Sequence, residues 1–196
     1  MLRKTLALAG MAVAWAGLAQ AQEITLPGVL ELSGAGAVSG TMFRNGAAMA
    51  IEEINAKGGI LGKKIKFEVV DTASDPGKAR AAVQRALDDK PIAILGPVFS
   101  GSVSATLKLT ADAETPQIMG GEAGPLTAQG SKYIFRTSFG QNVSMPKIAN
   151  YLRDGVKAKS VAVVFVNNDF GKGGRDAIVK ELGSRNIKIA ADISTE

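Results

Sequence analysis

The chain has 196 residues, of which 46% are hydrophobic and 21% charged, so it contains enough apolar residues to bury a core. It contains no cysteine and no histidine, which excludes disulfides, thiol nucleophiles, imidazole metal ligands and every catalytic pair built on either residue. The formal net charge of +5 comes from basic residues scattered among acidic ones, with few aromatic residues for base stacking. Nucleic acid is therefore not an expected partner.

Residues 1–21 are predicted to be a secretory signal. Arg3 and Lys4 precede the apolar run 6–18, and residues 19–21, Ala-Gln-Ala, form the small-x-small pattern of a cleavage site. The run is shorter than the ~20 apolar residues that span a bilayer, so a cleaved signal is favoured over a membrane anchor. We expect Gln22 to begin the mature chain and the protein to reach the periplasm without a lipidated cysteine.

Strands are predicted to alternate with helices through the first part of the mature chain. The expected strands are 24–32, 64–70, 92–95 and 117–119. Pro27 removes one backbone donor from the first of them, so its early residues are expected at a sheet edge or only loosely paired. A Gly-rich segment, 33–40, follows this strand.

Three helices are predicted between these strands. The first carries apolar residues at helical spacing from Phe43 to Ile54 and ends at the glycine pair 58–59. The second has Asp75 as its N-cap and a proline at its first position. For the third, Ser100 or Ser102 is the expected N-cap.

A second block is predicted after residues 136–138. Pro146 is expected to start a helix with Ile148, Ala149 and Leu152 facing inward, followed by a strand at 160–166. A helix at 171–182 and a strand at 187–193 are expected to follow. Together these are too few elements to cover both faces of a second sheet. The fold class is therefore α/β, with a doubly wound parallel sheet and the start of a second α/β unit.

Three segments carry a family resemblance: AIEEINAKGGILG at 50–62, FEVVD at 67–71 and SDP at 74–76. Together they resemble the type I periplasmic solute-binding proteins of the leucine/isoleucine/valine-binding family. The resemblance implies two α/β lobes that close on a small ligand and deliver it to the permease of an ABC importer in the inner membrane, with no catalysis and no cofactor. The sequence resembles the N-terminal half of such a protein, with 22–139 as the first lobe and 140–196 as an incomplete second lobe.

The resemblance also implies ligand-binding residues in the first lobe. Ser100 matches the family's serine at a helix N-terminus, where its hydroxyl and backbone N–H groups hold the ligand carboxylate. Gly124 lies where the family uses a threonine hydroxyl, and Glu122 brings a carboxylate that could hold a ligand ammonium or amide. Ser100 could instead be an ordinary N-cap, and Glu122 an exposed loop carboxylate.

Three further residues are expected at the pocket walls. Ser39 replaces a frequent aromatic wall residue, Phe99 precedes Ser100, and Phe170 matches an aromatic residue of the second lobe that covers the ligand. Alternatively, Ser39 is a turn serine and each phenylalanine packs on its own helix. The ligand implied is a branched-chain amino acid or a related small carboxylate, amide or aromatic acid.

Two other functions remain open at this point. An NAD(P)-type enzyme is suggested by Gly34, Gly36 and Gly40 after a strand, with Asp71 ending the next strand, although Asp71 lies well beyond the usual ~20-residue offset. A ligand-sensing receptor could use the same fold. If the 196 residues are the whole product, we expect an unclosed, unstable molecule without normal ligand binding.

Overall fold

The computed structural model describes residues 23–196, so the predicted signal 1–21 and the expected mature start Gln22 lie outside the described residues. Five parallel strands form one sheet in the order β2-β1-β3-β4-β5. Their bounds are β1 Ile24–Leu30, β2 Ile65–Asp71, β3 Ile94–Leu95, β4 Gln117–Met119 and β5 Ile134–Arg136. The predicted α/β class with a parallel sheet is confirmed.

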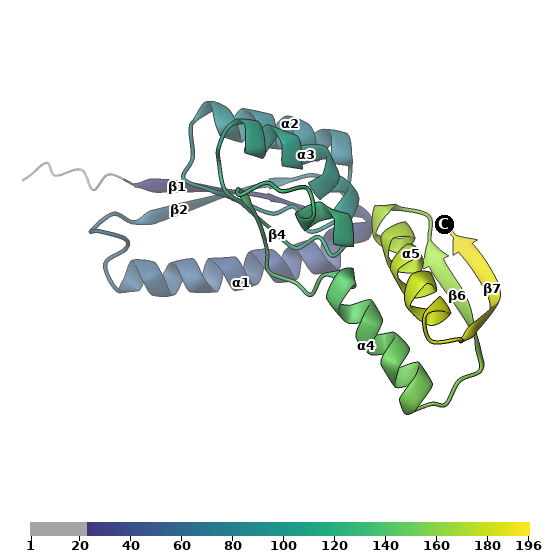
Figure 1. Cartoon of the computed structure of the whole chain (residues 1–196). Coiled ribbons are helices and arrows are strands. Elements are labelled where there is room, and N and C mark those ends of the chain that lie inside the picture. The colour runs from purple at the N-terminus through teal and green to yellow at the C-terminus, as the bar shows by residue number, and fades with distance from the viewer. Residues whose placement is uncertain (1–22) are drawn as a thin grey trace, which may run out of the picture.

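Helices cover both faces of this sheet. Helix α1 (Ala37–Ala56) lies on one face, and α2 (Pro76–Asp88) and α3 (Ser100–Asp112) lie on the other (Figure 1). Two clusters of buried apolar side chains join α2 and α3 to the strands beneath them. One cluster comprises Val29, Ala79, Ala82, Val83 and Ile94, and the other comprises Val103, Leu107, Met119, Ala123 and Leu126. Burial of these small and branched side chains is what holds the layers together.

Strand β1 is shorter than predicted, since it ends at Leu30, and it is an interior strand of the sheet. Its early residues nevertheless pair on one side only, because β2 matches all of β1 whereas β3 meets it at Gly28 alone. Ile24 donates to the carbonyl of Lys64, directly before β2, so the alternation of a strand turns Pro27 toward the unpaired side, where its missing donor breaks no bond.

The ends of the first two helices have local causes. Helix α1 begins at Ala37, earlier than the apolar pattern indicates, after a short 3-10 helix η1 at Gly34–Gly36. It stops before Gly58 and Gly59, whose φ angles of 104° and 81° are readily adopted only by glycine. Asp75 caps α2 as predicted, because its carboxylate accepts from the backbone N–H of Lys78 at 2.7 Å.

Two expectations, one for the N-cap of α3 and one for the extent of β3, are wrong. Neither serine caps α3, since Phe99 is its N-cap residue and Ser100 is its first helical residue. Strand β3 covers only Ile94–Leu95, and Ile92, expected to start it, is 60% exposed. Strand β5 was not predicted, although its residues Ile134 and Phe135 are ordinary strand formers.

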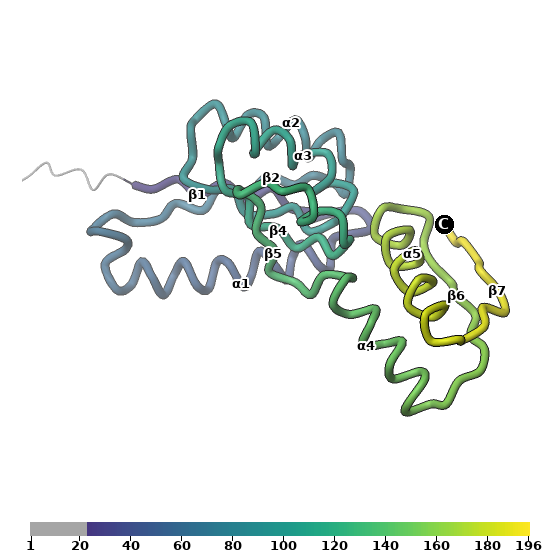
Figure 2. The backbone as a smooth tube through the Cα atoms, in the orientation of Figure 1, coloured from purple at the N-terminus to yellow at the C-terminus, as the bar shows by residue number. Residues whose placement is uncertain are grey.

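A second group of elements follows residue 140. It consists of α4 (Gln141–Asp154), β6 (Ser160–Val166), α5 (Asp169–Gly183) and β7 (Lys188–Thr195), with β6 and β7 paired in parallel. Helix α4 begins five residues before Pro146, which lies inside it and removes one helical N–H donor. Of the residues predicted to face inward, Ala149 is buried but Ile148 is 44% exposed. Figure 2 shows the chain passing from the five-stranded sheet into this group through the segment between β5 and α4.

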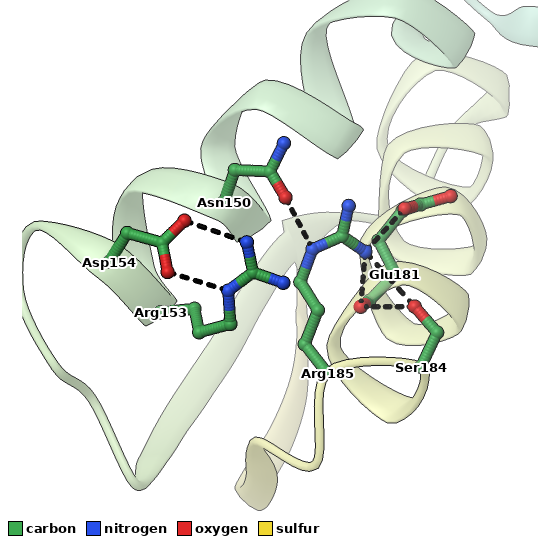
Figure 3. A network of polar contacts seen from close by, with 6 residues as sticks. All are labelled: Asn150, Arg153, Asp154, Glu181, Ser184 and Arg185. Carbon is green, nitrogen blue, oxygen red and sulfur yellow. Dashed lines mark hydrogen bonds and ion pairs between the residues drawn. The ribbon is translucent and has the colours of Figure 1, made fainter.

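Polar contacts join the two helices of the second group (Figure 3). Nε of Arg185, just beyond α5, donates to Oδ1 of Asn150 in α4 at 2.8 Å. The same guanidinium pairs with Glu181 through Nη1 and Oε2, 2.6 Å apart. Arg153 and Asp154 form a separate exposed pair on α4, of a kind that contributes little to stability. None of the helices within residues 23–196 combines the length and the hydropathy that a membrane span requires.

Candidate functional site

A cavity of about 730 Å³ lies between the first sheet and the second group of elements. Loops after the parallel strands and the first turn of α3 line one side, and the start of α5 lines the other. Loops at the carboxyl ends of parallel strands are where ligands of doubly wound sheets bind. Five of the six sequence-predicted residues line this cavity: Ser39, Phe99, Ser100, Glu122 and Phe170.

Gly124 is the predicted site residue that does not line the cavity. It begins the 3-10 helix η2 (Gly124–Thr127), and a side chain placed there would meet Asn142 of α4 rather than a ligand. The expected match of Gly124 to the family's threonine is therefore not supported by its position. Glu122, two residues earlier in the same loop, is the residue of this pair that reaches the cavity.

Ser100 ties the start of α3 to the loop that follows β4. Ser100 is only 3% exposed, and its Oγ accepts a hydrogen bond from the backbone N–H of Ala123 at 3.2 Å. Because the oxygen is the acceptor, the hydroxyl hydrogen remains free to be donated. The first backbone N–H groups of a helix have no intrahelical acceptor, so this end of α3 favours an anion.

Ser102 was considered in the sequence only as a cap, and the structure gives it a different setting. It is 1% exposed and lines the cavity, and its Oγ has no hydrogen-bond partner within residues 23–196. A buried hydroxyl without a partner is unfavourable unless a ligand or water satisfies it. Its place in the first turn of α3, two residues after Ser100, was the available sequence signal for this residue.

Glu31 is a buried carboxylate that the sequence analysis did not single out. It follows β1 directly, is fully buried, and accepts hydrogen bonds from the backbone N–H groups of Val98 at 2.9 Å and Phe99 at 3.3 Å. These bonds fix the segment that leads from β3 into α3. Half-buried Phe99 is thereby held at the cavity wall. An acidic residue directly after an apolar strand was the signal that could have identified it.

Asp71 holds the loop between β1 and α1. It accepts from the Ser33 hydroxyl at 2.6 Å and from the backbone N–H groups of Leu32, Ser33 and Ala73. The Ser33 hydrogen bond, followed by the backbone bonds, lowers the pKa of Asp71 to about 2. Asp71 is therefore engaged with its own chain. Ser39, predicted as a wall or turn residue, lies exposed in the first turn of α1 beyond this loop.

Arg136 fixes the backbone around Glu122. Its Nη2 donates to the carbonyl of Ala123 at 2.7 Å and its Nη1 to that of Glu122 at 3.4 Å, and burial lowers the pKa of its guanidinium. The Glu122 carbonyl also accepts from the backbone N–H of Gln141 at 2.9 Å. Gly140 leaves room for this arrangement, because a Cβ there would overlap the guanidinium.

Phe170 brings the second group to the cavity. It lies in the first turn of α5 and is 45% exposed, and its carbonyl accepts from Nε2 of buried Gln141 at 2.7 Å. Asn168 caps α5 by accepting from the N–H of Gly171 at 2.9 Å. Gln141 thus links the Glu122 loop through its backbone to the start of α5 through its side chain.

Within the described part of the chain, no group of three or more acidic side chains is placed to hold a metal ion. The arrangement is one of hydrogen-bond donors and apolar walls around a cavity, which is suited to binding rather than to catalysis.

Comparisons with known proteins agree with this geometry. The sequence profile of the family described as periplasmic binding protein matches residues 23–196. A Leu/Ile/Val-binding protein, BraC3, of Rhizobium johnstonii is 33% identical over 89% of this chain and 48% of its own length. A leucine-specific-binding protein of Salmonella typhimurium is 32% identical over 95% of this chain and 51% of its own length.

The crystal structure of a protein from Streptococcus pneumoniae shows the same similarity in three dimensions. This branched-chain amino acid transporter substrate-binding protein, LivJ, in complex with isoleucine, matches with a TM-score of 0.78 at 30% identity over 89% of this chain and 50% of that chain. The chain therefore spans about half the length of the relatives that it matches. The relatives are solute-binding proteins rather than enzymes, so the dinucleotide-enzyme alternative is not supported.

Proposed function

The chain belongs to the periplasmic binding protein family, and from this premise we propose that it is the solute-binding component of an ABC importer. In this proposal it acts in the periplasm, binds a branched-chain amino acid or a related small carboxylate, and presents the ligand to permease subunits in the inner membrane. Residues 22–139 form the first lobe and 140–196 open the second. The boundary is supported by the end of β5 at Arg136 and the start of α4 at Gln141.

The observation that carries the proposal is the start of α3 at the cavity. Ser100, Gly101 and Ser102 line the cavity from the first turn of this helix, where backbone N–H groups lack helical acceptors. Two serine hydroxyls lie beside them, and one of them is buried without a partner in the described chain. This donor set fits a ligand carboxylate and includes no catalytic group. The names of the relatives, which refer to leucine, isoleucine and valine, support an aliphatic amino acid.

Calorimetric titration of the protein, expressed from its complete reading frame, tests the proposal. We expect leucine, isoleucine or valine to bind saturably at one site, and to raise the free energy of unfolding by about 2.7 kcal/mol at a ligand concentration of 100 times Kd. Absence of any heat or thermal shift with amino acids and small carboxylates would overturn the proposal. Release of a nucleotide chromophore on denaturation would support the dinucleotide alternative instead.

Measuring ligand uptake by cells distinguishes a role in transport from a role in sensing. Cells that lack the gene should lose import of the radiolabelled ligand and regain it when the gene is restored. Normal uptake in the deletion strain, together with a loss of ligand-dependent transcription, would favour the sensing alternative.

A further inference from the structure

We propose that Gln141 is a positioning residue for the cavity, which sets the place of the Phe170 wall relative to the Glu122 loop and thereby affects ligand affinity. This inference rests on the proposed function and deepens it, because Gln141 itself is not among the residues that line the cavity. It is carried by the hydrogen bonds of Gln141, by its burial and by two glycines of α5 that accommodate its amide.

Gln141 connects two walls of the cavity through separate groups. Its backbone N–H donates to the carbonyl of Glu122, in the loop after β4, at 2.9 Å. Its side-chain Nε2 donates to the carbonyl of Phe170, in the first turn of α5, at 2.7 Å. Glu122 and Phe170 both line the cavity, the first from the five-stranded sheet and the second from the second group. The position of this one side chain therefore affects the separation of the two walls.

The Glu122 side of this connection is firmly held, whereas the Phe170 side is not. Arg136 donates to the carbonyls of Glu122 and Ala123, and its guanidinium also interacts electrostatically with the Glu122 carboxylate. Gln141 is 1% exposed, so neighbouring atoms surround its side chain. Phe170 is 45% exposed, so the described chain packs around only part of it. The hydrogen bond from Nε2 is therefore a direct restraint on the less firmly held wall.

Two glycines of α5 make room for the amide of Gln141. A Cβ at Gly173 would lie 2.8 Å from its Oε1, and a Cβ at Gly174 would lie 2.9 Å from its Nε2. A larger residue at either position would displace the amide or the helix. Glycine is a poor helix former, so two glycines in succession favour close contact with Gln141 over the stability of α5.

The stability of the fold does not account for an amide at this position. Oε1 of Gln141 is buried and has no hydrogen-bond partner within residues 23–196. A buried acceptor without a partner is unfavourable, and an apolar side chain of the same shape would avoid it. An α-helix also offers the Phe170 carbonyl the N–H of the residue four positions later. The hydrogen bond from Nε2 thus orients the cavity wall rather than satisfying a carbonyl that would otherwise be unpaired.

Gln141→Met tests the proposal in the protein expressed from its complete reading frame. Methionine has a similar length but cannot donate to the Phe170 carbonyl. We expect calorimetric titration with leucine, isoleucine and valine to show roughly 3- to 10-fold weaker binding than in wild type. The urea midpoint should change little, because the unpaired Oε1 is removed together with the hydrogen bond. Gln129→Met, at an exposed position that does not line the cavity, is the matched control and should bind with wild-type affinity.

A double-mutant cycle separates positioning from a general structural role. If Gln141 acts through Phe170, then Gln141→Met should weaken binding far less in a Phe170→Leu protein than in wild type. The same fold-change in both backgrounds would overturn the inference. Wild-type affinity in a folded Gln141→Met protein would do so as well.

A second pair of variants reaches the same amide from α5 and leaves Gln141 in place. The added Cβ of Gly174→Ala should displace Nε2 and weaken ligand binding. Gly183→Ala lies in the same helix, with no atom within 4 Å of its Cβ position beyond its own stretch of helix, and should not weaken binding. If Gln141→Met does not fold, as judged by circular dichroism, this pair decides the question. Equal affinity of the two glycine variants would then overturn the inference.

The two proposals fail in different ways. A wild-type protein that binds no amino acid and no small carboxylate overturns the proposed function and this inference with it. A wild-type protein that binds leucine, isoleucine or valine, and whose affinity is unchanged by Gln141→Met and by Gly174→Ala, overturns only the role of Gln141.

Discussion

At the scale of single residues, Ser100 and Ser102 show how two serines in one helical turn acquire different roles. The hydroxyl of Ser100 is bonded to the backbone N–H of Ala123, whereas that of Ser102 is buried without a partner in the described chain. The first hydroxyl contributes to the fold of the ligand-free protein. The second makes no hydrogen bond within the described chain, which leaves it available to a ligand.

Substitution by alanine should separate these roles. Ser100→Ala leaves the buried N–H of Ala123 unsatisfied, so we expect the free energy of unfolding to fall by about 1–3 kcal/mol. Ser102→Ala removes an unpaired buried hydroxyl and should leave stability unchanged or slightly higher while weakening ligand binding. Urea unfolding and calorimetric titration measure the two effects. Equal destabilisation by both changes would contradict the assignment.

Asp71 gives the loop between β1 and α1 a dependence on pH. Its folded pKa of about 2 lies below the unfolded value of ~3.9, so its hydrogen bonds stabilise the fold fully above the unfolded pKa. That contribution is lost as the pH falls through the folded pKa. We expect Asp71→Asn to lower the urea midpoint near neutral pH, and the difference from wild type to shrink as the pH approaches about 2.

The control for this prediction is Asp88→Asn, at an exposed position in the last turn of α2. It should not reproduce the loss seen in Asp71→Asn. A difference between Asp71→Asn and wild type that is the same at all pH values would show that the carboxylate charge is not what holds the loop.

At the scale of elements, two glycines of α1 show what sets the distance between this helix and the sheet. Gly40 is buried, and a Cβ at this position would overlap the backbone carbonyl of Glu31 at the end of β1. Gly46 lies on the same helix, and beyond its own stretch of helix no atom lies within 4 Å of its Cβ position. The close approach of helix and strand therefore requires glycine at one position and not at the other.

These glycines form a matched pair of substitutions. Gly40→Ala should lower the free energy of unfolding by about 1–3 kcal/mol or more, because the overlap is with backbone that cannot rotate away. Gly46→Ala should raise it by about 0.5–1 kcal/mol, since alanine favours the helix more than glycine does. Urea unfolding of both variants is the measurement. A stabilised Gly40→Ala protein would indicate that α1 does not pack this closely on β1.

At the scale of the whole molecule, the second group leaves apolar side chains of its sheet exposed. Val164 in β6 and Ile193 in β7 are register partners and are 62% and 49% exposed. Two strands with one covering face make a marginally stable sheet in water. Adjacent exposed apolar residues on such a sheet favour association.

Residues 23–196 produced alone should therefore bind a hydrophobic dye and self-associate, as measured by fluorescence and light scattering. Replacing Val164 and Ile193 together by threonine should reduce both signals. Val38→Thr, at a 69% exposed position on α1, is the control and should not. A monomeric segment that binds no dye would contradict the prediction.

The sequence by itself determined the class of the fold, the family and several elements, because these depend on local patterns. The strands at 117–119 and 160–166 have their predicted bounds, and Asp75 caps α2 as its position before a proline indicates. Each of these features follows from apolar spacing or from a hydrogen bond between near neighbours in the chain. The resemblance of the segment 50–76 to the periplasmic solute-binding proteins likewise needed no coordinates.

Only the tertiary structure decided which residues share the cavity and what each hydroxyl and carboxylate contacts. The start of α1 depends on a bond between Ser33 and Asp71, which are 38 residues apart, and the wall at Phe99 depends on Glu31, 68 residues away. The sequence could not show that Ser102 lines the cavity and Gly124 does not, because burial and loop direction arise from the packing of α3 against η2 and β4. Contacts between distant segments are set by packing, which no local pattern contains.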